Sequence, residues 1–273
     1  MKIFVFTGGF GNQIFEYAFY LHLKKVFPNE HFYGLYGKKL SEHYGLEIDK
    51  WFHINLPPQP WWVLPVIGIF YLYKQCFPNS KWLDLNQSDW IHPKAKVFFP
   101  FKFTKKFVPM ENGWLQWKID EATLSDENKA VLSEIRRTDS CFVHIRRGDY
   151  LSPGYKFLFE NCCTIEYYKK ALALMKQKYP NIRFICFSDD ISWVRGNLNF
   201  DNDVLFVDWN NGKNSPLDMY LMSQCKNAII ANSTFSYWGV RLGVEKELVI
   251  YPKRWWNSKN GSPNIFMDEW VGV

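Results

Sequence analysis

The sequence predicts an α/β protein whose carboxyl-terminal half contains a parallel, doubly wound sheet. Between residues 141 and 252, short apolar runs typical of buried strands alternate with amphipathic helical segments, which is the pattern of strand–helix–strand units. The 273 residues are 47% apolar and 22% charged, which excludes a disordered chain and provides enough material for real cores. We predict two domains, residues 1–124 and 125–273.

The first predicted element is a strand over residues 3–7, followed by a glycine-rich turn at residues 8–11. A helix from Asn12 to Val26 should follow, because apolar residues recur there at helical spacing and a proline comes shortly after. The opening apolar run is too short for the core of a signal peptide. Residues 30–120 are aromatic, rich in proline and weakly periodic, so we expect only short helices and loops there.

A helix over residues 125–137 opens the second half. Five strands are predicted after it, at Cys141–Arg146, Arg183–Phe187, Val204–Val207, Ala228–Ala231 and Leu248–Tyr251.

Capping residues mark the helices between these strands. Thr164 should cap a helix from Ile165 to Tyr179. Ser215 should cap the next helix, with Pro216 at its first position and Asp218 at its third.

Charge and cysteine content limit the partners and the compartment. The net charge of +6 is mild, and no run of five or more Lys or Arg predicts nucleic-acid binding. The six cysteines show no CxxC spacing, and most lie in apolar runs, so we expect reduced thiols in a cytoplasmic protein.

The longest uncharged stretch, residues 54–73, contains four prolines, which exclude a membrane-spanning helix. Two interpretations remain open. One is a loop followed by a short buried helix. The other is a peripheral membrane contact with Trp61 and Trp62 at the level of the lipid headgroups.

Polar clusters follow three of the predicted strands, where parallel sheets bind ligands. In the first cluster, His144 and Arg146 share one face of the strand, while Val143 and Ile145 point into the opposite layer. The planar guanidinium of Arg146 suits a phosphate. Arg147 and Asp149 we expect to be largely structural.

The second cluster is Ser188-Asp189-Asp190. Its carboxylates could cap the following helix or accept hydrogen bonds from a ribose or a guanine edge. A metal is the third alternative, but no further ligand is clearly placed to complete its shell. Asp201-Asn202-Asp203 resembles a metal-binding motif but precedes a strand, and should lie at the wrong end of the sheet.

The third cluster comprises Asn232, Ser233, Thr234 and Phe235 at the start of a helix, where free backbone N–H groups favour an anion. The chain has no phosphate-loop lysine motif and no true GxGxxG fingerprint, which argues against nucleotide hydrolysis and hydride transfer. Cations without an obvious metal site favour an enzyme that itself stabilises a nucleoside-diphosphate leaving group.

Four motifs resemble those of the alpha-1,2-fucosyltransferase family, in the same order along the chain. They are Gly8–Ala18, His144–Tyr150, Phe187–Asp190 and Asn232–Gly239. The middle of the chain, about residues 30–120, carries little resemblance.

The resemblance implies a GT-B-like fold, with two Rossmann-type halves and the active site in the cleft between them. It implies inverting, metal-independent transfer of fucose from GDP-L-fucose to the 2-hydroxyl of a terminal galactose. The short form of the sequence, with no membrane anchor, resembles the bacterial members of the family. These act at the cytoplasmic face of the plasma membrane on lipid-linked glycans, in surface polysaccharide or O-antigen synthesis. No cofactor is implied.

The resemblance also implies roles for individual residues. Arg146 would hold the pyrophosphate, His144 and an Asp of the 189/190 pair would orient the nucleoside, and Asn12 with Gln13 would face the reacting centre. The donor site would comprise Gly11, Gln13, His144, Arg146, Arg147, Ser188, Asp189, Asp190, Asn232, Ser233, Thr234 and Phe235. The catalytic residues would be Arg146, His144 and Asn12.

The general base stays open among Asp149, Glu16 and His144. Two other functions also stay open, an O-fucosyltransferase of different acceptor or linkage and a glycan-binding module built on the tryptophan-rich first half.

Overall fold

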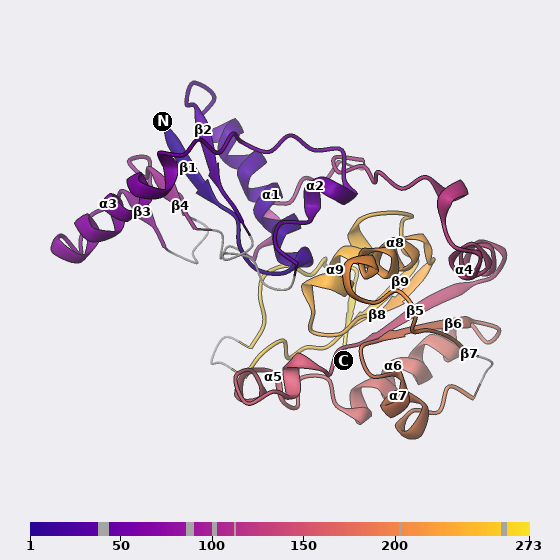
Figure 1. Ribbon diagram of the computed structural model, residues 1–273. Coiled ribbons are helices and arrows are strands. Elements are labelled where there is room, and N and C mark those ends of the chain that lie inside the picture. Colours follow the sequence, from indigo (N-terminus) through magenta and orange to yellow (C-terminus); the bar gives the residue numbers. More distant parts are fainter. Residues whose placement is uncertain (38–43, 86–89, 100–102, 112, 202–203, 258–260) are drawn as a thin grey trace. The chain divides into compact units, whose positions relative to one another are not determined.

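The computed structural model describes residues 1–37, 44–85, 90–99, 103–111, 113–201, 204–257 and 261–273 (Figure 1). The chain forms two compact units, Met1–Ile119 and Asp120–Val273. The division falls five residues before the predicted one. Glu121, in the short 3-10 helix η2 (Glu121–Thr123), accepts hydrogen bonds from Arg136 of α4 (Asp126–Arg137) and thereby belongs to the second unit.

The first unit contains a parallel sheet of order β2-β1-β4-β3. Its strands are β1 (Lys2–Val5), β2 (Phe32–Leu35), β3 (Leu83–Asp84) and β4 (Val97–Phe98). Its helices are α1 (Phe10–Val26), α2 (Ile48–Trp51), α3 (Val63–Cys76) and the 3-10 helix η1 (Lys105–Phe107). The prediction of only helices and loops over residues 30–120 was therefore wrong, because β3 and β4 are two residues long and give no alternating pattern.

Alternation along β1 assigns one helix to each face of this sheet. Phe4 and Phe6 point toward α1, where the Phe4 ring lies 5.8 Å from Phe19. Ile3 and Val5 pack with Val63 and other residues in the core under α3. In Figure 1, α1 and α3 accordingly lie on opposite sides of the strands.

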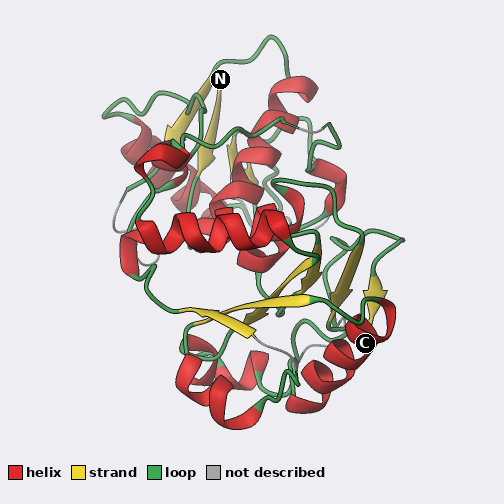
Figure 2. Ribbon diagram, turned by 90° about the vertical axis from the view of Figure 1, so that its right-hand side faces the viewer, coloured by secondary structure: helices red, strands yellow, loops and turns green. Residues whose placement is uncertain are grey.

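The second unit contains a parallel sheet of order β10-β9-β8-β5-β6-β7. Its strands are β5 (Ser140–Ile145), β6 (Arg183–Ser188), β7 (Val204–Val207), β8 (Asn227–Ile229), β9 (Leu248–Tyr251) and β10 (Val271–Gly272). Its helices after α4 are α5 (Lys156–Phe159), α6 (Ile165–Lys178), α7 (Ile191–Asn197), α8 (Pro216–Gln224) and α9 (Thr234–Arg241), with the 3-10 helices η3 (Asp149–Leu151) and η4 (Gly212–Asn214). Figure 2 shows helices (red) on either side of the strands (yellow).

The strand order creates a topological switch point beside β5. From β5 the chain moves outward through β6 to β7, then returns to β8 on the other side of β5 and continues to β9. Successive crossovers therefore leave in opposite directions at the carboxyl ends of β5 and β8. In open α/β sheets a crevice forms at this place and binds the ligand.

Most local predictions for the second unit are confirmed. Thr164 accepts a hydrogen bond from the Tyr167 backbone N–H at the start of α6, and Val143 and Ile145 lie in the apolar core with that helix. Ser215 occupies the N-cap position of α8, with Pro216 directly after it and Asp218 in the first turn, as predicted, but it does not cap the helix through its side chain. Its backbone is helical because η4 runs directly into α8.

The uncharged segment forms α3, which is not buried: only Val63 and Ile67 of this helix are. Pro65 is tolerated because the first turn of a helix has no intrahelical partner for its N–H groups. Among the described residues, no helix combines the length and apolar character needed to cross a bilayer. All six cysteines are described and are free thiols.

Candidate active site at the strand ends of the second unit

His144 lies near the carboxyl end of β5, on the face opposite Val143 and Ile145. Its side chain is only 5% exposed, and its ring centroid lies 5.8 Å from that of Phe235 in α9. Burial, together with the positive charge of Arg146, lowers the pKa of His144 to about 3. The imidazole is therefore neutral, and its Nδ1 atom has no hydrogen-bond partner among the described residues. A buried polar atom of this kind is available to a ligand.

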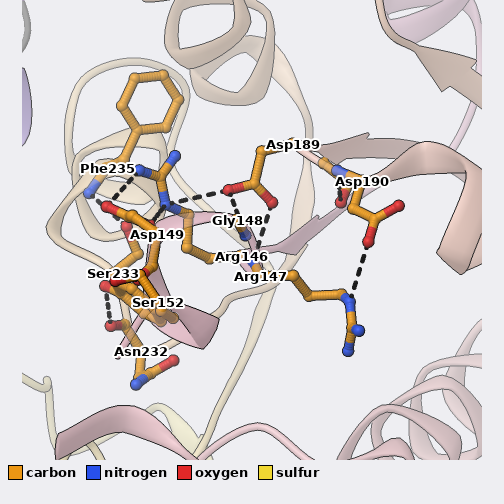
Figure 3. Close-up of polar contacts among 12 residues, drawn as sticks. Arg146, Arg147, Gly148, Asp149, Ser152, Asp189, Asp190, Asn232, Ser233 and Phe235 are labelled. Carbon is orange, nitrogen blue, oxygen red and sulfur yellow. Dashed lines mark hydrogen bonds and ion pairs between the residues drawn. The ribbon is translucent and has the colours of Figure 1, made fainter. Parts of the chain in front are cut away.

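Arg146 is held by two carboxylates. Its Nε and Nη2 atoms donate to the two oxygens of Asp149, each at 2.9 Å, and Nε lies 3.3 Å from Asp189 Oδ2 (Figure 3). This fork geometry fixes the plane of the guanidinium. The Nη1 atom makes no hydrogen bond to any described residue, and the side chain is 28% exposed. Asp149, which we expected to be largely structural, is therefore paired with an arginine.

Asp189 joins the ends of β5 and β6. Its two oxygens accept the backbone N–H groups of Arg147 at 2.8 Å and of Gly148 at 3.0 Å. A side chain at position 148 would bring its Cβ to 2.9 Å from Asp189 Oδ2, so glycine is needed for this approach. The Asp189 carboxylate is thus used to shape the turn that presents Arg146.

Asp190 caps α7, one of the three alternatives named for this cluster. Its Oδ1 atom accepts the backbone N–H of Trp193 at 3.0 Å, and its Oδ2 atom lies 3.3 Å from Nε of Arg147. The Arg147 guanidinium lies 3.7 Å from the centre of the Trp193 ring. Ser188 accepts the N–H of Asp190. As expected, Arg147 has structural contacts, and Figure 3 shows it directed away from Arg146.

The start of α9 lies at the end of β8, across the switch point from β5. Ser233 accepts the backbone N–H of Phe235 at 3.2 Å, and Thr234 begins the helix. Tyr150 connects the two turns, since its hydroxyl donates to the backbone oxygen of Asn232 at 3.0 Å. The first and third predicted clusters therefore lie side by side.

The side chain of Asn232, which the resemblance places in the donor site, has structural partners, and its role in donor binding stays a prediction. Asn232 is 2% exposed, its Nδ2 atom donates to the Trp255 oxygen at 2.9 Å, and its Oδ1 atom accepts the thiol of Cys163 at 3.3 Å. The side chain is used to fix the loop before α9.

In the first unit, the turn between β1 and α1 is closed by its own side chains. Gln13 is fully buried: its Nε2 atom donates to the oxygens of Gly8 and Gly45, and its Oε1 atom accepts the N–H of Glu47 at 2.9 Å. The described contacts of Gln13 are thus structural, and its predicted place at the donor site stays a prediction. Gly8 has φ +69°, a conformation that favours glycine.

Glu16 is 2% exposed and accepts both the backbone N–H and the hydroxyl of Thr7. Burial raises its pKa well above the usual value. These contacts leave it poorly placed to serve as the general base. Gly11 is buried in the first turn of α1, and Asn12, beside it, is half-buried.

The arrangement in the second unit suits an anionic group. A fixed guanidinium, a neutral imidazole and the amino end of α9 lie together at the carboxyl ends of β5 and β8, with Tyr150 and Phe235 beside them. Among the described residues, no group of three or more His, Cys, Asp or Glu side chains gathers in a way that could hold a metal ion.

The second unit is also the part of the sequence that the model of a known family matches. The family described as glycosyl transferase family 11 matches residues 118–273, more than half of the chain. The chain belongs to glycosyl transferase family 11.

Relatives of this glycosyltransferase align over nearly the whole chain. An alpha-1,2-colitosyltransferase of Escherichia coli is 30% identical and covers 98% of this chain and 97% of its own. The O-antigen biosynthesis glycosyltransferase WbnK of Escherichia coli is 27% identical, with 98% of each chain covered. The fucosyltransferase NodZ from Bradyrhizobium has a similar structure, with a TM-score of 0.54 and 13% identity over 89% of this chain and 92% of its own. That likeness supports the GT-B-like fold.

Two residues with clear roles at this family 11 site were missed from the sequence. Tyr150 stands in the motif of the first cluster and links the strand ends, and Trp193 supports Arg147. An aromatic residue directly after Arg-Arg-Gly-Asp was the available signal for Tyr150. The sequence held no signal for Trp193, because its contact with Arg147 depends on the packing of α7 against the turn after β5.

Proposed function

We propose that this family 11 glycosyltransferase transfers L-fucose from GDP-β-L-fucose to the 2-hydroxyl of a terminal β-galactose, with inversion, in the synthesis of a surface polysaccharide or O-antigen. The observation that carries the proposal is the meeting of Arg146, His144 and the amino end of α9 at the switch point between β5 and β8. A nucleoside diphosphate has the negative charge that suits these groups, and ligands of open α/β sheets bind at the switch point. Motif resemblance supplies fucose and the 2-hydroxyl, and the relatives' names support the O-antigen context.

In this proposal, Arg146 stabilises the departing diphosphate. Its Nε and Nη2 atoms are fixed by Asp149, so the guanidinium does not reorganise as negative charge develops on the leaving group. The backbone N–H groups at the start of α9 add to this stabilisation. We propose that the transfer requires no metal ion, because the protein's own cations take that role.

His144 orients the nucleotide through a hydrogen bond. A group with a pKa of about 3 is neutral at physiological pH and is a weak base, so His144 is poorly suited to accept the proton of the galactose hydroxyl. Asp149 keeps its candidacy as the general base, although both of its oxygens contact Arg146.

A second donor is favoured by the relative with the highest identity given above. Colitose lacks the 3-hydroxyl of fucose, and the 30% identical relative is named for its transfer. A site that hydrogen-bonds the 3-hydroxyl of fucose would discriminate strongly against a sugar without it.

One experiment tests donor, acceptor and linkage together. The protein is incubated with GDP-fucose or GDP-colitose and a panel of β-galactosides, in buffer containing EDTA, and the product linkage is determined by NMR. The proposal expects fucose on the 2-hydroxyl of galactose. Preference for GDP-colitose, another linkage, or activity only after magnesium is restored would each contradict the corresponding part of it.

A further inference from the structure

Helix α3 presents an apolar face to solvent. Its inward stripe, Val63, Val66, Ile67 and Phe70, packs on the sheet of the first unit. Its outward side chains are also apolar, and Leu64, Ile69 and Leu72 are 62%, 65% and 66% exposed. A surface helix of a soluble domain ordinarily has charged or polar residues on that side. The only charged residue in α3 is Lys74.

Aromatic side chains flank both ends of this face. Trp61 precedes the helix and is 86% exposed. At the other end, Tyr73 stacks on Trp82 with ring centroids 4.5 Å apart, and Phe77 contacts Tyr73 at the same distance. Tryptophan and tyrosine concentrate at membrane interfaces, where one side of the ring meets lipid and the other meets water.

The charged residues of the sequence segment that contains α3 are basic. No Asp or Glu occurs between Asp49 and Asp84. Lys81 and Lys94 are exposed and lie near the carboxyl-terminal end of the helix. Lys81 precedes Trp82, which stacks on Tyr73 of α3. Lys94 is near Trp82 as well, because the backbone N–H of Lys96 bonds to the Trp82 oxygen.

The whole net charge of the protein resides in the unit that carries α3. Residues 1–119 contain 14 lysines, no arginine and 8 acidic residues, whereas residues 120–273 contain 19 basic and 19 acidic residues. The first unit therefore has a net charge of +6 and the second a net charge of zero.

We propose that α3 is a docking element for an anionic lipid bilayer. The helix lies in the plane of the interface, with Leu64, Ile69 and Leu72 in the outer acyl region and Trp61 at the headgroups, while Lys81 and Lys94 beside the helix face acidic lipids. This proposal is independent of the donor and the linkage. A second copy of the chain is a less suitable partner for this face, because it would bring two units of charge +6 together.

Vesicle binding tests the proposal. Co-sedimentation is measured with vesicles of phosphatidylcholine alone and of phosphatidylcholine with phosphatidylglycerol. We expect binding to the acidic vesicles that weakens with added salt. The double variant Leu64→Glu/Leu72→Glu should reduce the partition coefficient at least about tenfold. Its fold should persist, because both side chains are exposed.

A matched control makes the same change elsewhere. Leu174→Glu alters an exposed leucine of α6 in the second unit and should sediment like the wild type. Cys76, the only exposed cysteine, allows an environment-sensitive fluorophore to be attached at the end of α3. Its emission should shift to shorter wavelength on acidic vesicles.

Three results would overturn the inference. They are wild-type protein that ignores acidic vesicles, a double variant that binds as the wild type does, or a wild-type dimer in solution that the double variant converts to monomer without any vesicle binding. The last result would assign the face to a second copy.

Discussion

The turns after β1 and after β5 occupy the same position in two parallel sheets, yet they use their polar side chains differently. After β1, the polar groups of Gln13 and Glu16 bond to the backbone and to Thr7 of their own unit, and both side chains are buried. After β5, the acidic residues hold the turn, while Nδ1 of His144 and Nη1 of Arg146 make no bond to the described residues. A strand-end motif therefore marks a binding site only where structural partners leave some of its polar atoms available.

The largest expected effect concerns the turn after β5, where Arg146 has an atom without a bond to the described residues. Arg146→Ala should reduce transfer by about 10²–10³-fold or more, because it removes the fixed charge beside the leaving group. It should also abolish the increase in melting temperature that we expect GDP to produce with the wild type. Arg137→Ala removes an exposed arginine of α4 and should leave both unchanged.

Since Arg146→Ala also leaves Asp149 and Asp189 without their partner, Arg146→Lys separates function from folding. It keeps the charge but loses the fork, and should fold well while transferring slowly. Wild-type transfer by both variants would remove the distinction between the two turns.

In the turn after β1, a substitution should change the free energy of unfolding but not the affinity for GDP. Gln13→Leu leaves the buried N–H of Glu47 and the oxygens of Gly8 and Gly45 without their partner, and should lower the free energy of unfolding by about 2–3 kcal/mol. GDP affinity, measured by calorimetry below the melting temperature, should not change. Gln116→Leu, at an exposed position of the same unit, is the control. A loss of GDP affinity with unchanged stability would support the predicted place of Gln13 at the donor site.

Substitutions of Asp189, which supports the turn with Arg146, and of Asp190, which caps α7, should have different effects on GDP binding. Asp189→Ala should cost about 2 kcal/mol in unfolding free energy and weaken GDP binding, because it frees two backbone N–H groups and one anchor of Arg146. Asp190→Ala removes a cap and should cost about 1 kcal/mol with a smaller effect on GDP. Denaturant unfolding and GDP titration of both variants measure this, and equal effects would contradict the separation.

The last expected effect is a pH dependence of stability in the second unit. Burial raises the pKa of Asp218 to about 7, against an ordinary value of 3.8, despite its hydrogen bond from Asn210. The folded state thus binds the extra proton between these values, and its contribution to stability is present below pH 3.8 and is lost as pH rises to 7. His144 acts oppositely. Its lowered pKa makes the folded state bind fewer protons, so stability rises with pH between about 3 and 6.5.

The pH dependences of stability from Asp218 and from His144 oppose each other between about pH 3.8 and pH 6.5. Asp218→Asn removes the first and should leave the one from His144. Unfolding free energy of the variant should rise from pH 4 to pH 6.5 more steeply than that of the wild type, by up to about 1.4 kcal/mol per pH unit. Parallel curves for the two proteins, measured by denaturant unfolding, would contradict the raised pKa.

Several features of this protein depend on short-range interactions and could be predicted from the sequence. Apolar periodicity and the Thr164 cap define α6, and alternation along β5 puts Val143 and Ile145 in the core and His144 on the other face. The four motifs were sufficient to suggest the family, which the match over residues 118–273 confirms. The domain boundary, the site roles and the metal independence stay predictions.

Only the tertiary structure decided which polar residues of those motifs were available. Gln13 is buried because Gly45 and Glu47, more than thirty residues away, accept and donate to its amide. Asn232 is buried because Cys163 and Trp255 reach it from other loops. The two-residue strands β3 and β4 exist only through their pairing in the sheet. Periodicity and caps report contacts within a few residues, whereas hydrogen bonds between distant segments depend on the packed fold, and these bonds determine whether a motif residue supports the structure or meets a ligand.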